Sequence, residues 1–102
     1  MTANRERGEA AIELGGRQRV LRPSFAALVA AEDELGPLFA LVERASSGQL
    51  RLTEMVALFW HCLADRDGVT REMLGETIAA RGLAACSAPL RAILVQILQG
   101  GT

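Results

Sequence analysis

His61, the one histidine of this 102-residue chain, is the first candidate for chemistry. A general base needs a nucleophile within hydrogen-bond reach and usually a carboxylate that orients its ring. Asp65 lies four residues further on, so on a helix it could share a face with His61 and orient it. Cys62 points about 100° away from His61 on a helix and cannot pair with it. Because no second ligand stands at metal spacing, we predict that His61 has neither a catalytic nor a metal role.

Residues 65–68 (Asp-Arg-Asp-Gly) resemble the middle of a calcium-binding loop, where acidic residues alternate before an obligatory glycine. With Gly68 at the sixth loop position, Leu63 and Leu74 occupy the first and twelfth positions, where carboxylates are required. We therefore interpret this segment as a turn between helices. The glycine pairs do not form a phosphate loop, because none precedes a Lys-Ser/Thr helix start. No metal and no other cofactor is expected.

Arg17, Arg19 and Arg22 form a basic edge on an expected strand and are candidate partner-binding residues. Such an edge could bind phosphate or an acidic partner, although charged edge strands also block sheet-to-sheet aggregation. Eleven basic and twelve acidic residues give a formal net charge of −1, and no aromatic side chain stands between these arginines. A stacking platform for single strands is thus missing, and we expect no nucleic-acid partner.

Glu32, Asp33 and Glu34 form an acidic run near the end of an expected helix. Acidic groups at that end oppose the helix macrodipole, and a cost of this kind sometimes marks a binding surface. A solvated helix face is the alternative interpretation. We include these three residues among the candidate partner-binding residues.

A β-hairpin is expected at residues 9–22, because two extended runs flank the pair Gly15-Gly16. Glycine accepts the positive φ of the tight primed turn that such a hairpin needs. A one-residue slip would exchange Leu21 for Val20 on the core face, so the register stays open. A two-residue turn would pair Leu14 with Arg17, Ile12 with Arg19 and Ala10 with Leu21.

Five short helices are expected after Pro23, over residues 25–35, 37–45, 54–64, 71–81 and 88–99. The third is apolar on almost every side, which is typical of the buried centre of a bundle. Apolar area also extends beyond the stripe of the last helix at Val95, which we therefore expect to contact other chains. Helix N-caps are expected at Ser24, Thr53, Thr70 and Ser87. The expected core faces of the other helices are Phe25, Leu28, Val29 and Leu35; Leu38, Phe39, Leu41, Val42 and Ala45; Met73, Leu74 and Ile78; and Leu90, Ile93, Leu94, Ile97 and Leu98.

The predicted fold is mostly α within the α+β class, with an N-terminal β-hairpin before a compact bundle of about five short helices. One globular domain is expected over residues 9–99, with the hairpin at 9–22 and helices over 24–99. Residues 1–8 are expected to be a flexible leader and 100–102 a tail. No apolar run approaches the ~20 residues of a membrane span, and no apolar signal core is present. Cys62 and Cys86 stand alone in apolar surroundings, as buried thiols of a cytoplasmic protein do.

A family resemblance rests on the segment from Gly8 to Leu35. It contains the glycine hairpin, then residues 21–28 (Leu-Arg-Pro-Ser-Phe-Ala-Ala-Leu), then an acidic helix end with Leu35-Gly36. This segment resembles the small tail proteins of gene transfer agents and phages, which are labelled tail tube protein or tail assembly chaperone. The likeness continues through residues 57–60 (Ala-Leu-Phe-Trp) and the Ala- and Leu-rich last helix. It implies a role in building a phage-like tail and no catalytic residues.

The resemblance implies partners among phage-like tail proteins, of the tube or tape-measure type, and self-association stays open. A tube subunit needs long strands for a continuous β ring, whereas this chain offers only a short hairpin. We therefore favour a tail assembly chaperone over a structural tube subunit, and a small helix-turn-helix regulator is the more distant alternative. The expected binding surface is the hairpin, whose open edge could accept a strand, with the adjoining first helix. The expected location is the cytoplasm, with incorporation into a particle left open.

Overall fold

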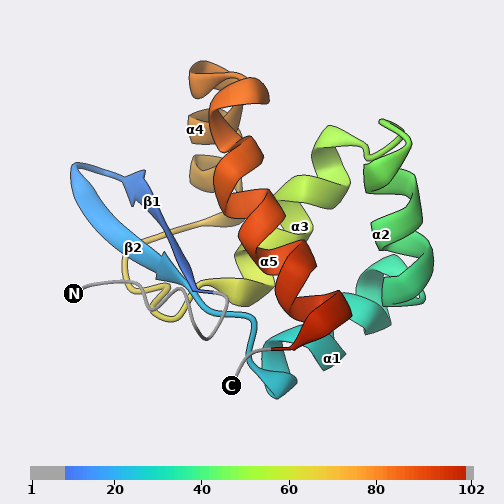
Figure 1. Ribbon diagram of the computed structural model, residues 1–102. Helices are drawn as coiled ribbons and strands as arrows, with labels where there is room; N and C mark the ends of the chain where they lie inside the picture. Colours follow the sequence, from blue (N-terminus) through green and yellow to red (C-terminus); the bar gives the residue numbers. More distant parts are fainter. Residues whose placement is uncertain (1–8, 101–102) are drawn as a thin grey trace.

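The computed structural model describes residues 9–100, so the expected leader at residues 1–8 and most of the expected tail lie outside the described residues. An N-terminal hairpin precedes five α-helices, and this confirms the predicted fold class (Figure 1). The short helix η2 is the one element that was not expected. The elements in chain order are β1 (Ala10–Leu14), β2 (Arg17–Leu21), α1 (Phe25–Leu35), α2 (Leu38–Ser46), α3 (Leu52–Cys62), α4 (Arg71–Arg81), the 3-10 helix η2 (Ala84–Cys86) and α5 (Ser87–Gln99).

The hairpin turns at Gly15 and Gly16, whose φ angles are 59° and 78°. Its strands pair in the register that a two-residue turn predicts, with Ile12 opposite Arg19, so the slipped register is excluded. Val20 is nevertheless as buried as Leu21. The reason is that the segment following α3 runs along the outer edge of β2, which covers this end of the strand.

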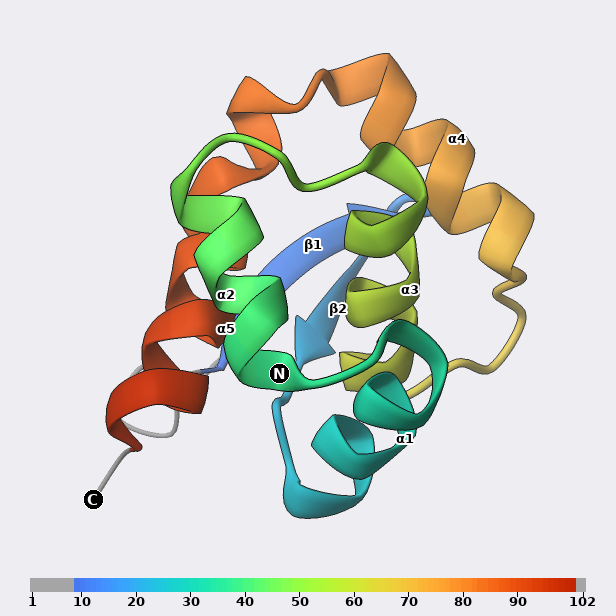
Figure 2. The ribbon, with the colours of Figure 1, turned by 90° about the vertical axis from the view of Figure 1, so that its right-hand side faces the viewer.

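Helix α3 lies at the centre of the molecule, with α1 and α4 packed against it and the hairpin beside it (Figure 2). Six of its eleven residues are buried, and Leu58 and Phe59 are fully enclosed. This confirms the expectation that the most apolar helix forms the centre of the bundle. Leu74 and Ile78 of α4 and Ile93 of α5 complete the same core.

Some large residues that were expected in the core lie on the surface. On α1 the buried residues are Ala27 and Ala31, and their small side chains let this helix approach α3 closely. The rotation that buries these alanines turns Phe25 and Val29 outward, so the predicted core face of α1 was wrong for these two residues, whereas Leu35 packs against the core as predicted. Phe39, Met73 and Leu98 are exposed for the same kind of reason, because neighbouring positions on their helices face the core.

The helix caps were predicted correctly at two of four positions. Ser24 and Thr70 each accept a hydrogen bond from the backbone N–H three residues later, at 3.2 and 3.1 Å. Thr53 is not a cap, because α3 begins at Leu52 and the carboxylate of Glu54 accepts the Arg51 N–H instead. Ser87 is the first residue of α5, and its hydroxyl donates to the carbonyl of Ala84 in η2.

Within residues 9–100, no single helix has the length and apolarity that crossing a membrane requires. The stretch from Arg71 to Gln99 reaches both only when its two helical parts are combined across a bend of 112°.

Candidate protein-binding surface

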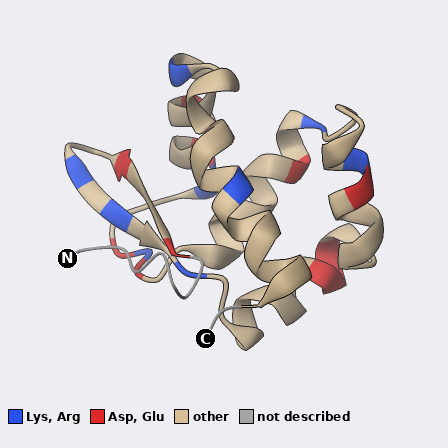
Figure 3. Ribbon diagram, viewed as in Figure 1, with Lys and Arg blue, Asp and Glu red and all other residues tan. Residues whose placement is uncertain are grey.

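The three arginines of the expected basic edge lie in three different environments. Arg19 is only 7% exposed, and its Nη1 lies 3.6 Å from the carboxylate of Asp65 and 3.3 Å from that residue's carbonyl oxygen. Arg22 donates from Nε to the buried carboxylate of Glu9 at 2.6 Å. Arg17 is exposed beside the turn. The structure therefore presents one of the three guanidinium groups fully to solvent, and the blue segments of β2 in Figure 3 are not a continuous charged surface.

The acidic run at the end of α1 is likewise divided. Glu32 accepts a hydrogen bond from the Leu38 N–H at 3.1 Å, and so caps the N-terminus of α2. The carboxylate of Glu34 is partly exposed, and side chains of α3 and α4 supply its partners. Of these three acidic residues, Asp33 is exposed and has no such partner among the described residues.

Glu34 binds two basic side chains from different helices. Arg71 of α4 donates to both of its carboxylate oxygens, at 2.6 and 3.0 Å, and the His61 Nε2 lies 2.7 Å from Oε1. The hydrogen bonds from Arg71, and next those from His61, lower the pKa of Glu34 from 4.5 to about 2. Asp65, which could have oriented His61, pairs with Arg19 instead. This cluster joins α1, α3 and α4.

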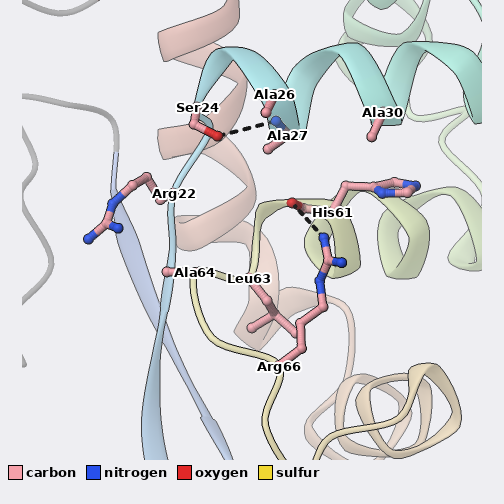
Figure 4. A pocket seen from close by; sticks show the side chains of 9 residues that line it. All are labelled: Arg22, Ser24, Ala26, Ala27, Ala30, His61, Leu63, Ala64 and Arg66. Atoms are coloured by element: carbon pink, nitrogen blue, oxygen red, sulfur yellow. Dashed lines mark hydrogen bonds between the residues drawn. The ribbon is translucent and has the colours of Figure 1, made fainter.

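A hollow of about 530 Å³ opens between α1 and the segment following α3 (Figure 4). Its polar groups are engaged elsewhere: the Ser24 hydroxyl caps α1, and Arg66 donates to the carbonyl oxygens of Trp60 and His61. Arg22 extends away from α1, toward β1 (Figure 4). The wall on the α1 side is formed by Ala26, Ala27 and Ala30.

The outer face of α1 beside this hollow is apolar, and we call Phe25, Ala26, Val29 and Ala30 the α1 surface. Phe25 is 85% exposed, and Val29 lies one helical turn further on. The hollow adjoins this surface because Ala26 and Ala30 belong to both. A large exposed aromatic residue next to a shallow hollow is the kind of feature that marks a protein contact.

Helix α5 presents a second apolar region. Val95 is 45% exposed and Leu98 52% exposed, and they lie between two grooves that flank the helix. One groove, of about 360 Å³, separates α5 from α2, and the other, of about 650 Å³, separates α5 from β1. Arg91 is the single charged residue of this helix (Figure 3). The exposure of Val95 agrees with the expectation that α5 has more apolar area than the core can bury.

The two cysteines are free and buried. Burial raises the pKa of the Cys62 thiol to about 12 and also raises that of Cys86, so neither is a reactive thiolate at neutral pH. Within residues 9–100, no three His, Cys, Asp or Glu side chains are grouped as a metal site would require.

Comparison with known proteins gave one match. A protein-family model described as phage tail tube protein, GTA-gp10, matches residues 7–100 and so includes both strands and all five α-helices. No curated protein and no solved structure matched.

Proposed function

This chain belongs to the family described as phage tail tube protein, GTA-gp10, and we propose that its role in that setting is that of a tail assembly chaperone. Its partners are phage-like tail proteins of the tube or tape-measure type. The chain covers apolar surface on such a component until that component polymerises. Binding takes place in the cytoplasm. Incorporation into the particle is expected for the alternative role, that of a structural subunit.

The observation that carries this proposal is the α1 surface. A domain that buries Phe59 fully leaves Phe25 with most of its ring in water. Transfer of an exposed apolar side chain into an interface contributes about 1.5–3 kcal/mol, so Phe25 and Val29 together supply a substantial anchor. The charged groups of the hairpin and of α1 are mostly committed inside the domain. Recognition is therefore mainly apolar, with Arg17 and Asp33 at the margin.

The edges of the hairpin support a chaperone over a tube subunit. A ring of β-strands that continues from subunit to subunit needs two open edges on each subunit. Here each strand has five residues, and the segment following α3 occupies the outer edge of β2 at Val20 to Arg22. The family description names a tube protein, and this is the reason to keep a tube-associated subunit as the second candidate.

The same surfaces support a role without catalysis. The ring of His61 is held by Glu34, and the Ser24 hydroxyl serves as a helix cap. The nearby thiol of Cys62 is enclosed and protonated at neutral pH. An activated nucleophile needs a base within hydrogen-bond reach. The Ser24 hydroxyl and the His61 ring line the hollow beside α1, but each has another partner, so they are not paired in this way.

Co-expression with tube-type and tape-measure-type tail proteins tests this proposal. The unaltered domain is expected to capture at least one of them, and Phe25→Ser combined with Val29→Ser is expected to abolish capture. Leu83→Ser is the matched control, because Leu83 is half exposed and the α4–η2 connection lies at the far end of the molecule from α1 (Figure 1). Equal capture by the unaltered domain, the double variant and the control would show that the α1 surface does not bind the tail protein. Capture of no tail protein would remove the proposed function.

The charge of the hairpin can be tested in the same assay with Arg17→Glu alone. Arg19 is unsuitable, because a carboxylate at that buried position would face Asp65 and disturb the fold. We expect Arg17→Glu to weaken capture only slightly, as a marginal charge does.

A further inference from the structure

The two edges of the hairpin differ in what lies along them. At the outer edge of β2, the Ala64 N–H donates to the Val20 carbonyl at 2.9 Å, and the Arg22 N–H donates to the Cys62 carbonyl at 2.6 Å. Leu63 thereby forms an antiparallel bridge with Leu21. The end of this edge at Val20 to Arg22 is thus covered by an extended segment of the chain itself.

The outer edge of β1 has no such segment. Val20 directs its backbone groups outward from β2, and Ala11 lies directly opposite it, so Ala11 directs its own groups outward from β1. The alternation of a strand gives Glu13 the same orientation. Among residues 9–100, no backbone group bonds to the N–H or C=O of Ala11 or Glu13 along this edge.

A groove of about 650 Å³ runs along the first part of this edge, between β1 and α5. Ala10 and Ala11 line it on the strand side, and Ala88, Ala92 and Val95 line it on the helix side. These side chains are small or apolar, so an added segment could place alternate apolar side chains against α5. Closer to the turn, Arg81 of α4 pairs with Glu13 of β1 at 3.0 Å.

Arg91 supplies a polar contact at the same groove. It is exposed, and no residue of the described part of the chain forms an ion pair with it. An acidic side chain on an incoming segment would complement this guanidinium group.

We infer that the outer edge of β1 binds an extended segment of a tube-type tail protein, which adds to the hairpin as a further strand. The segment has apolar residues at alternate positions, facing α5, and a carboxylate that reaches Arg91. The segment at the opposite edge is the internal precedent, because its antiparallel bridge shows that this sheet can pair with further extended backbone. This inference rests on the proposed function, because it specifies how the tail protein is held.

A pair of proline substitutions tests the edge. Ala11→Pro removes an N–H that the β1–β2 pairing does not use, and proline is tolerated on such an edge strand. Gln18→Pro makes the same change on β2, at a position whose backbone groups also point outward but away from the groove. The probe is the tube-type tail protein used in the co-expression test. We expect Ala11→Pro to weaken its binding by roughly tenfold or more, and Gln18→Pro by less than about twofold.

Amide hydrogen exchange on the unaltered domain provides a readout that needs no substitution. On binding the tube-type protein, the amides of Ala11 and Glu13 are expected to become protected, whereas that of Gln18 is expected to keep its rate. Unchanged exchange at Ala11 and Glu13 in the complex would overturn the inference, even if Ala11→Pro fails to fold.

The outcomes separate this inference from the proposed function. Equal binding by the two proline variants overturns strand addition and leaves the chaperone proposal intact. Capture of a tape-measure-type protein, with no binding of the tube-type protein, also overturns strand addition alone. Capture of neither tail protein overturns both.

Discussion

Helices α3 and α5 are similar in apolar composition and differ in how the fold uses it. Helix α3 is buried by its neighbours, and its end at His61 is joined to α1 and α4 through Glu34. Helix α5 buries Ile93 fully and packs Leu90, Leu94 and Ile97 against the core only in part, and no ion pair within residues 9–100 involves it. The apolar side chains of α3 thus stabilise the domain. On α5 and on the outer face of α1, part of the apolar surface stays exposed to solvent.

The largest expected effect separates two phenylalanines. Phe59→Ala should lower the free energy of unfolding by about 3–5 kcal/mol, because the side chain is fully enclosed and its removal leaves a cavity. Phe25→Ala should change it by less than about 0.5 kcal/mol, because the ring is mostly exposed. Chemical denaturation of both variants measures the difference. Similar losses in the two variants would mean that Phe25 belongs to the core.

A smaller effect is expected at the start of α1. Ser24→Ala removes the hydroxyl that accepts the Ala27 N–H, and should cost about 1 kcal/mol. Denaturation against the unaltered chain gives this value, and Ser46→Ala, at the exposed last residue of α2, is the control. If both serines cost the same, the cap has no special part in holding the α1 surface.

The stability that the Glu34 cluster contributes is expected to depend on pH. Glu34→Gln should lower stability at pH 7 by up to about 1 kcal/mol, since the carboxylate is partly exposed. The folded-state pKa lies near 2, below the unfolded value of about 4.5. The stabilisation is therefore complete above pH 4.5 and is lost as the pH falls toward 2.

Unfolding midpoints at several pH values between 7 and 2 check this sign. The gap between the unaltered chain and Glu34→Gln is expected to narrow as the pH falls. A gap that widens on acidification would contradict the role given to Arg71 and His61.

The smallest expected effect on stability is at Val95. Because this side chain is nearly half exposed, Val95→Glu should change the free energy of unfolding by less than about 0.5 kcal/mol. It should nevertheless weaken capture of a tail protein or self-association, because a charge is placed between the two grooves of α5. Denaturation and sedimentation measure the two effects separately. A variant that unfolds would show that Val95 is a core residue.

Local sequence signals predicted the hairpin well, because the register follows from a two-residue glycine turn and the boundaries from caps such as Ser24 and Thr70. The face of α1 that turns inward could not be predicted in this way. Periodicity favoured the larger residues, whereas close packing on α3 selected Ala27 and Ala31.

The candidate binding residues were harder to predict for the same reason. Glu34 and His61 are separated by 27 positions, so no local pattern pairs them. The burial of Arg19 likewise depends on Asp65, which a later turn brings to it. The exposure of Val95 was predicted because an apolar residue outside a complete stripe is a local signal. The α1 surface was missed because Phe25 and Val29 had been assigned to the core.

The chaperone proposal is tested most directly by the composition of finished tail particles. Quantitative mass spectrometry of purified particles measures the copies of this chain relative to the tube subunit. The account predicts that the chain binds the tail protein before polymerisation and is absent from the finished tail, or far below one copy per tube subunit. Stoichiometric presence in every ring of the tube would contradict it and identify the chain as a structural subunit.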